Sequence, residues 1–432
     1  MLTTALSGEI LILLQLSVAL ISGLLMSRVA KIFNLPAVTA YLVAGILIGP
    51  CALGLFGVEG LGFISFDEVS SFSIICDAAL GFIAFSIGNE FRVSELKKIG
   101  KQAVVISILE AVVATLLVDA VLIGCHFLFW QDKLPLTVCI TLGAIASATA
   151  PAATLMVVRQ YKAKGPVTKM LLPVVALDDA VGLVIFAVSF GIAKTIATGS
   201  TDIVAILVNP LVEIVFSLAL GALMGWLFSE TEKLFHSRTK RLSISVTFIL
   251  LTVALSMLKF EIGRVTIASS TLLVCMMLGT VFCNICDFSK ELMERCERWS
   301  TPLLVLFFVF SGAELDLFVF GDVIILAVGI IYILTRSAGK IWGTELGCVC
   351  MKTEPTVTKY LGITMLPQAG VALGMSLQVA KALGEDGTMV RNIVLFGVLI
   401  YELLGPTLTR MALTKAGEIN PAERKSSRGS AV

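Results

Sequence analysis

Long uncharged apolar runs alternate with short charged stretches along the whole chain. A helix needs about 20 predominantly apolar residues to cross the hydrocarbon core of a bilayer. Counted from one charged stretch to the next, the pattern predicts thirteen such helices, so we expect an all-α polytopic membrane protein. The predicted spans are residues 9–27, 35–56, 70–89, 102–129, 134–158, 170–193, 204–229, 242–259, 265–286, 299–318, 321–343, 359–381 and 391–411.

The basic residues are distributed unequally between the two sides of these spans. Lysine and arginine concentrate in the cytoplasmic loops of membrane proteins. Most of them follow odd-numbered spans or lie in the polar stretch 412–432, which predicts an outside N-terminus and a short cytoplasmic tail. Glu9 precedes the first apolar run and Arg28 follows it, a pattern typical of a retained span rather than a signal peptide. Only six of the 32 lysines and arginines follow even-numbered spans: Lys133, Lys194, Lys259, Arg264, Lys381 and Arg391.

Composition narrows the class of protein further. Apolar residues make up 57% of the 432 residues and charged residues 15%, against about 45–50% and about 25% in soluble domains. These values exclude a soluble enzyme and a disordered scaffold. The net charge of +1 gives no basic bias toward nucleic acid. The two histidines and the scattered cysteines form no zinc or haem pattern, so we expect no cofactor.

Two of the predicted spans are interrupted by proline among small residues. Span five contains Pro151 in SATAPAA, and span twelve contains Pro367 and Gly370 in LPQAGVALGM. A broken helix persists in a membrane only where protein or a water-filled cavity satisfies the freed backbone groups. The breaks lie an odd number of spans apart, so the two helices run in opposite directions. We therefore predict one transporter-like transmembrane domain, 1–411, with inverted repeats at about 9–193 and 242–411 and a linker helix at 204–229.

Two adjacent acids, Asp178 and Asp179, lie well inside span six in the sequence ALDDAVGL. Ionisable residues inside a membrane segment are costly, and their default interpretation is functional. Consecutive helical residues point about 100° apart, so one carboxylate can face a cavity while the other faces a neighbouring helix. Hard cations such as Na⁺ prefer oxygen ligands. We interpret the pair as a site that binds either a monovalent cation or a proton.

Span eleven contains Lys340, with Arg336 one turn earlier. Lys340 either pairs with an aspartate when no cation is bound or extends to the cytoplasmic surface, and the sequence leaves both open. Six further acids lie singly inside predicted spans, where we expect structural roles or partnership with basic residues. These acids are Asp77, Glu110, Asp119, Glu213, Glu314 and Glu402.

These motifs resemble those of the monovalent cation:proton antiporter superfamily, in particular the bacterial sodium/proton antiporters of NapA and NhaA type. The likeness extends over essentially the whole chain. It rests on ALDDAVGL, on SATAPAA, on LFFVFSGAELDL at 306–317, on Lys340 followed by Gly343, and on LPQAGVALGM.

The resemblance implies an NhaA-like fold with crossed discontinuous helices, in which spans four to six and eleven to thirteen form a core. It also implies a homodimer in the cell membrane that exchanges Na⁺, or else Li⁺ or K⁺, for protons and serves pH homeostasis. Asp179 would carry the ion or proton, Asp178 would form a salt bridge with Lys340, and Thr149 would stand beside the first break. Exchange of two protons for one cation would make transport electrogenic.

Three alternatives compete with this interpretation. An intramembrane diaspartyl protease needs carboxylates that converge from different helices, which adjacent aspartates on one helix cannot do. An ion channel fits less well, because paired breaks in repeated halves favour alternating access. A sodium-coupled solute symporter of the same architecture stays open. We expect a transporter and no enzyme.

Overall fold

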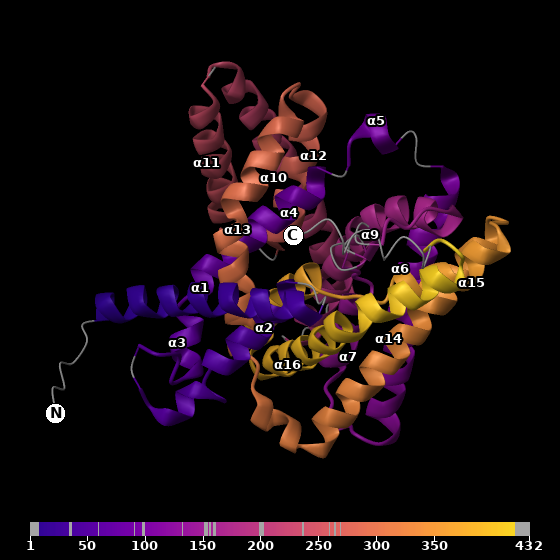
Figure 1. The fold of residues 1–432 in the computed structure, drawn as a ribbon, viewed down its shortest axis with the longest axis horizontal. Helices are drawn as coiled ribbons and strands as arrows, with labels where there is room; N and C mark the ends of the chain where they lie inside the picture. Colours follow the sequence, from indigo (N-terminus) through magenta and orange to yellow (C-terminus); the bar gives the residue numbers. More distant parts are fainter. Residues whose placement is uncertain are drawn as a thin grey trace, which may run out of the picture. The chain divides into compact units, whose positions relative to one another are not determined.

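The computed structural model describes residues 8–33, 37–58, 60–89, 91–96, 100–131, 133–150, 154, 157–158, 161–197, 203–235, 237–258, 260–262, 265–267 and 269–419 (Figure 1). Pro151 lies outside the described residues. Asp179 is described as part of a helix, but its side chain is not.

The described chain is helical apart from one short antiparallel hairpin. The helices are α1 Gly8–Phe33, α2 Ala37–Ile48, α3 Phe66–Ser70, α4 Ser73–Asn89, α5 Val93–Leu96, α6 Lys101–Leu128, α7 Leu136–Ala146, α9 Pro166–Ala197, α10 Ile203–Lys233, α11 Arg238–Ser256, α12 Thr271–Ile285, α13 Ser289–Ala313, α14 Val323–Cys350, α15 Pro355–Thr364 and α16 Gly370–Lys415. Two 3-10 turns, η1 Leu53–Phe56 and η2 Leu317–Gly321, accompany them, and the hairpin pairs β1 Phe260–Ile262 with β2 Val265–Ile267.

Several of these helices can cross a membrane. In the described part of the chain, seven are long and apolar enough, in α1, Ala37–Phe56, α6, α10, α11, α14 and α16, and shorter apolar helices lie between them. A helix satisfies its own backbone groups, which is the requirement for crossing lipid. The multi-pass, essentially all-helical prediction is therefore confirmed, while the count of thirteen spans stays a prediction.

One predicted boundary is wrong. The predicted span 265–286 begins in strand β2, and its helix, α12, starts only at Thr271, because the β-branched run from Val265 to Ile267 favours a strand. Predicted spans twelve and thirteen, by contrast, are separated within α16 by a sharp kink at Gly384, after which the chain folds back, so that Arg391 donates to the carbonyl oxygen of Leu373 at 3.4 Å. Gly384 forms this kink in the left-handed region, with φ of 57°, which glycine adopts without steric cost.

The chain forms two compact units, each made of two separate segments. Within the described residues, unit 1 comprises Met1–Arg92 and Leu211–Leu326, and unit 2 comprises Val93–Pro210 and Ala327–Val432. Unit 2 therefore contains predicted spans four to six, twelve and thirteen and most of span eleven, the six helices that the family resemblance assigns to the core.

In unit 1, two GxxxG pairs, Gly45 with Gly49 and Gly221 with Gly225, lie at close helix contacts. A Cβ atom added at Gly45 would lie 1.9 Å from the carbonyl oxygen of Val309 on α13, and one at Gly221 would lie 2.4 Å from that of Val274 on α12. No side chain fits at such distances, so glycine permits the close approach of these backbones.

In unit 2, three glycines of α14, spaced four residues apart, form a seam against α6. Added Cβ atoms at Gly339, Gly343 and Gly347 would lie 2.7, 2.7 and 2.8 Å from the Cα atoms of Ala114, Glu110 and Ile106, respectively. This order makes the two helices antiparallel. We call this contact the glycine seam; it brings the backbone of Glu110 next to the turn of α14 that carries Lys340.

Part of the predicted tail is folded. Helix α16 continues to Lys415, and Leu413 and Ile419 belong to the buried core of unit 2. Glu418 accepts hydrogen bonds from the backbone N–H groups of Val167 at 2.6 Å and Thr168 at 2.9 Å. It thus caps the first turn of α9, where the unpaired N–H groups and the helix dipole favour a carboxylate.

Candidate functional site

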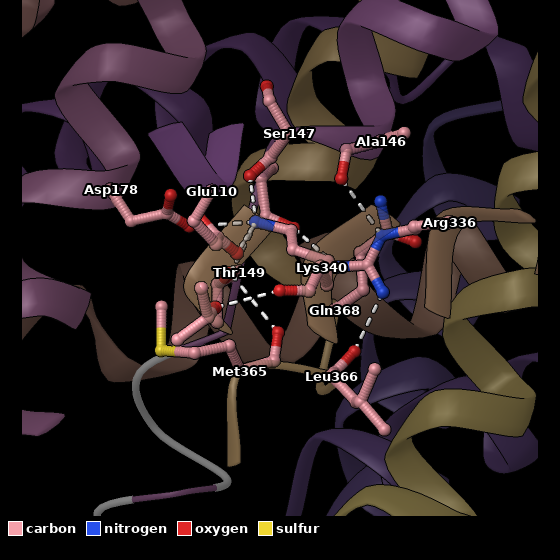
Figure 2. A network of polar contacts seen from close by, with 12 residues as sticks. Glu110, Ala146, Ser147, Thr149, Asp178, Arg336, Lys340, Met365, Leu366 and Gln368 are labelled. Atoms are coloured by element: carbon pink, nitrogen blue, oxygen red, sulfur yellow. Dashed lines mark hydrogen bonds and ion pairs between the residues drawn. The ribbon is translucent and has the colours of Figure 1, made fainter. Parts of the chain in front are cut away.

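Lys340 is the centre of a buried polar site in unit 2 (Figure 2). Its Nζ donates hydrogen bonds to the carbonyl oxygen of Ser147, to Thr149 Oγ1 at 2.8 Å and to Asp178 Oδ2 at 3.1 Å. A second carboxylate oxygen, Glu110 Oε1, lies 2.6 Å from the same nitrogen. Lys340 is fully buried, so the alternative in which it extends to the cytoplasmic surface is wrong.

The aspartate pair lies on α9. Asp178 is fully buried and contacts Lys340, as the resemblance implied. Its other oxygen, Oδ1, has no hydrogen-bond partner among the described residues. This unpartnered buried oxygen is suited to a cation or a proton. The backbone of Asp179 occupies the next position of α9, and its side chain lies outside the description.

The two interrupted segments meet at this site. Helix α7 ends at Ala146 and α15 ends at Thr364, and each is followed by non-helical residues. The backbone N–H of Ala150 donates to the carbonyl oxygen of Pro367 at 2.8 Å. The hydroxyl of Thr149 donates to the carbonyl oxygen of Met365 at 3.3 Å.

These contacts bring together the predicted residues Thr149 and Pro367. Gly370 is the first residue of α16, directly after the second break. The contacts satisfy groups that the breaks release from helical bonding.

Arg336, for which the sequence suggested no role, binds both breaks. It is fully buried, and its guanidinium donates to the carbonyl oxygens of Ala146 at 3.1 Å, Ala148 at 2.6 Å and Leu366 at 2.7 Å. These oxygens lie at the C-terminal ends of two half-helices, where unpaired carbonyls and the helix dipole concentrate negative charge. One arginine therefore compensates two helix ends at once.

Gln368 makes a further link between the breaks. Its Nε2 donates to the carbonyl oxygen of Ile145 at 3.0 Å and to Tyr332 Oη at 3.0 Å. The second break is thereby tied both to α7 and to α14. All three residues of the link are buried, so these hydrogen bonds are shielded from water.

The buried site holds one basic side chain and two acidic ones. Lys340 carries one positive charge between two carboxylates, Glu110 and Asp178, all fully buried. Burial makes an uncompensated charge costly, so the second carboxylate favours a proton or a small cation. Helix breaks that expose backbone carbonyls beside buried acids are typical of ion-coupled transporters.

Comparison with known protein families agrees with the geometry of this site. The profile of the family described as "Sodium/hydrogen exchanger, transmembrane" matches residues 16–415. The chain belongs to this family, so it is a transporter that exchanges monovalent cations for protons, and not an enzyme. The predicted superfamily is confirmed, and the symporter and protease alternatives find no support.

Two relatives are similar in sequence over most of the chain. The high-affinity Na⁺/H⁺ antiporter NhaS3 of a Synechocystis species is 24% identical over 400 residues, covering 84% of this chain and 81% of the relative. The cation/H⁺ antiporter 19 of Arabidopsis thaliana is 24% identical over 405 residues, covering 92% of this chain. The matched part makes up only 48% of the plant protein.

A solved structure shares the fold. The sodium proton antiporter MjNhaP1 of Methanocaldococcus jannaschii, solved at pH 8, matches with a TM-score of 0.70 and 20% sequence identity. The match covers 93% of this chain and 97% of that one. The NapA and NhaA subgroup inferred from the motifs stays a prediction.

The sequence interpretation missed how Glu110 and Arg336 act. Glu110 was one of six single acids, expected to be structural or to partner a basic residue, and the structure makes it a partner of Lys340. The spacing of Gly339, Gly343 and Gly347 was the available signal, because small residues every four positions predict close packing against another helix. No local pattern identifies the helix ends that Arg336 binds.

Proposed function

We propose that this chain is a sodium/proton antiporter that works by alternating access across a cell membrane and serves pH homeostasis. The observation that carries the proposal is the buried contact between Lys340 and Asp178 beside the meeting point of two broken helices. A cation that enters this site finds carboxylate oxygens and displaces a proton from them. The names of NhaS3 and MjNhaP1, both sodium antiporters, support Na⁺ as the cation.

The aspartate pair has two roles in this proposal. Asp179 carries the cation or the proton, which rests on the family resemblance. Asp178 is a ligand that Lys340 holds when no cation is bound, which is supported by the 3.1 Å contact. Thr149 lies 2.8 Å from the same lysine and adds a hydroxyl oxygen to the site.

The proposed architecture is the one that the sequence analysis predicts. Thirteen spans form two inverted repeats whose broken helices cross, and two chains form a homodimer. The N-terminus lies outside and the C-terminus in the cytoplasm, as the distribution of lysine and arginine indicates. Cysteines introduced at 59–69 or 198–203 should react with an impermeant reagent applied to sealed cells, and those at 160–168 should not. Labelling of 160–168 from outside would reverse the orientation.

The function is tested in proteoliposomes loaded with a pH-sensitive dye. Addition of Na⁺, Li⁺ or K⁺ in turn should move protons in the opposite direction, with the largest response to Na⁺. Asp178→Asn and Asp179→Asn should each abolish this response, because an amide neither ionises near neutral pH nor offers a charged oxygen to the cation. Asp119→Asn is the matched control, because Asp119 is a half-buried acid on α6 that makes no ion pair within the described residues. Normal exchange by both aspartate variants would refute the assigned site.

A further inference from the structure

The strongest unassigned feature of the site is the second carboxylate beside Lys340. Glu110 is fully buried on α6 and its Oε1 lies 2.6 Å from Lys340 Nζ, closer than the 3.1 Å of Asp178 Oδ2. The proposed exchange uses Asp178 and leaves Glu110 without a function. A buried carboxylate this close to the central lysine stabilises the ammonium charge, so it influences each step in which the lysine takes part.

The hydrogen bonds of Lys340 show how its protons are distributed. An ammonium group has three N–H donors, and those of Lys340 point to Ser147, Thr149 and Asp178. Glu110 therefore makes a short charge contact with no N–H aligned on it. Neither of its carboxylate oxygens has a hydrogen-bond partner among the described residues. Glu110 is thus a carboxylate in ion-pair contact with the lysine whose oxygens still have room for a hydrogen bond.

The backbone fixes this arrangement. The glycine seam places the Cα atom of Glu110 against Gly343 on the same helix as Lys340. Asp178, by contrast, approaches the lysine from α9. The pair formed by Glu110 and Lys340 is therefore set by tight contact between two helices, whereas the contact with Asp178 depends on a third.

We propose that Glu110 is a positioning residue that receives Lys340 when a cation takes Asp178. The N–H that leaves Asp178 turns to Glu110, which already lies within hydrogen-bond distance. The lysine exchanges one carboxylate for another, and its buried charge is paired in both states. Because the ammonium of Lys340 stays paired, cation binding at Asp178 does not cost the free energy of a buried unpaired charge. The affinity of the site for the cation is therefore higher than it would be without Glu110. The inference rests on the proposed function and adds a residue to it.

The test measures cation affinity in the purified full-length protein through thermal stabilisation by NaCl, with choline chloride at equal ionic strength as the reference. A ligand that binds only the folded state raises the unfolding temperature as its concentration exceeds its Kd. Glu110→Gln should weaken the apparent Na⁺ affinity by about tenfold or more, because the amide cannot compensate the lysine. Asp119→Asn, a change of a half-buried acid on the same helix, should leave the affinity within about twofold of the original.

A double-mutant cycle separates action through the lysine from direct action on the cation. If Glu110 acts through Lys340, Glu110→Gln should change the Na⁺ affinity of a Lys340→Gln protein by less than about twofold. An equal loss in both backgrounds would overturn the proposal, because Glu110 would then act on the cation itself. An unchanged affinity of Glu110→Gln in the otherwise native protein would overturn it as well.

Where Glu110→Gln does not fold, Glu110→Asp takes its place. The shorter side chain draws the carboxylate away from the ammonium, so the expected loss of affinity and the overturning result are the same. Failure of the proposed function has a separate signature: the native protein would show no Na⁺-driven proton movement in proteoliposomes, whatever the affinity of the Glu110 variants.

Discussion

The backbone N–H of Ala150 donates a 2.8 Å hydrogen bond to the carbonyl oxygen of Pro367, which joins two helix breaks that lie more than 200 residues apart in sequence. Each break on its own would leave backbone groups unpaired in a membrane. Because the two breaks bond to each other, each supplies part of what the other lacks. Side chains of α14 bind further carbonyl oxygens at the breaks: Arg336 binds three of them, and Lys340 binds that of Ser147.

Arg336→Gln should strongly destabilise the protein. The variant loses charged hydrogen bonds to Ala146, Ala148 and Leu366, and leaves buried carbonyl oxygens unpaired. Removal of one partner from a buried charged contact costs about 3–5 kcal/mol, which thermal unfolding in detergent should detect. Arg410→Gln is the matched control, because Arg410 also lies over a tyrosine ring but is exposed. Equal unfolding temperatures of the two variants would contradict the role of Arg336.

The proposed mechanism has the cation and the proton compete for the same aspartates, so the affinity for Na⁺ should depend on pH. The half-maximal Na⁺ concentration should rise about tenfold for each unit of falling pH over the range in which one proton is displaced per cation. The measurement is Na⁺-driven proton movement in proteoliposomes at fixed ionic strength over several pH values. A half-maximal concentration that does not change with pH would indicate separate sites.

Gly343→Ala should damage the contact between α6 and α14. The added Cβ would lie 2.7 Å from the Cα atom of Glu110, so the helices must separate, at a cost of about 1–3 kcal/mol. Gly329→Ala on the same helix is the control, since its Cβ would meet only Phe396 at 3.6 Å. There the higher helix propensity of alanine should stabilise the protein by up to about 1 kcal/mol. Unfolding temperatures that move in the same direction would refute the seam.

Glu418→Ala should destabilise α9 at its first turn. The variant removes the acceptor for the N–H groups of Val167 and Thr168, and loss of a cap costs about 0.5–2 kcal/mol. Glu354→Ala is the control, because Glu354 precedes α15 but makes no capping hydrogen bond. Hydrogen exchange at 167–170 should accelerate in the first variant only. Unchanged exchange there would mean that the cap contributes nothing to the helix.

The sequence predicted those residues of the site that stand out within a single apolar segment. Asp178 and the breaks around Thr149 and Pro367 stand out because charge and proline are rare in apolar runs. The partners of Arg336 and Glu110 could not be predicted in the same way. Those contacts depend on which helix ends and faces meet across long stretches of chain, and no periodicity within one helix encodes this.

At the C-terminal end, the average composition of the segment gave the wrong expectation. From Ala412 onward the chain is polar in composition, which predicts a tail. Yet Leu413 and Ile419 are buried and Glu418 caps α9. Two apolar side chains and one carboxylate are too small a signal to change a composition average, although in three dimensions they attach the segment to the core.

The docked C-terminal segment has a practical consequence for anyone who labels or purifies this antiporter. An affinity tag or fluorescent reporter joined directly after α16 at Lys415 would remove Glu418 and Ile419, and with them the cap on the helix that carries the aspartates. A fusion placed after Ile419 keeps these contacts. Loss of activity in a shortened, tagged protein would then report a poorly chosen fusion point rather than a requirement of transport.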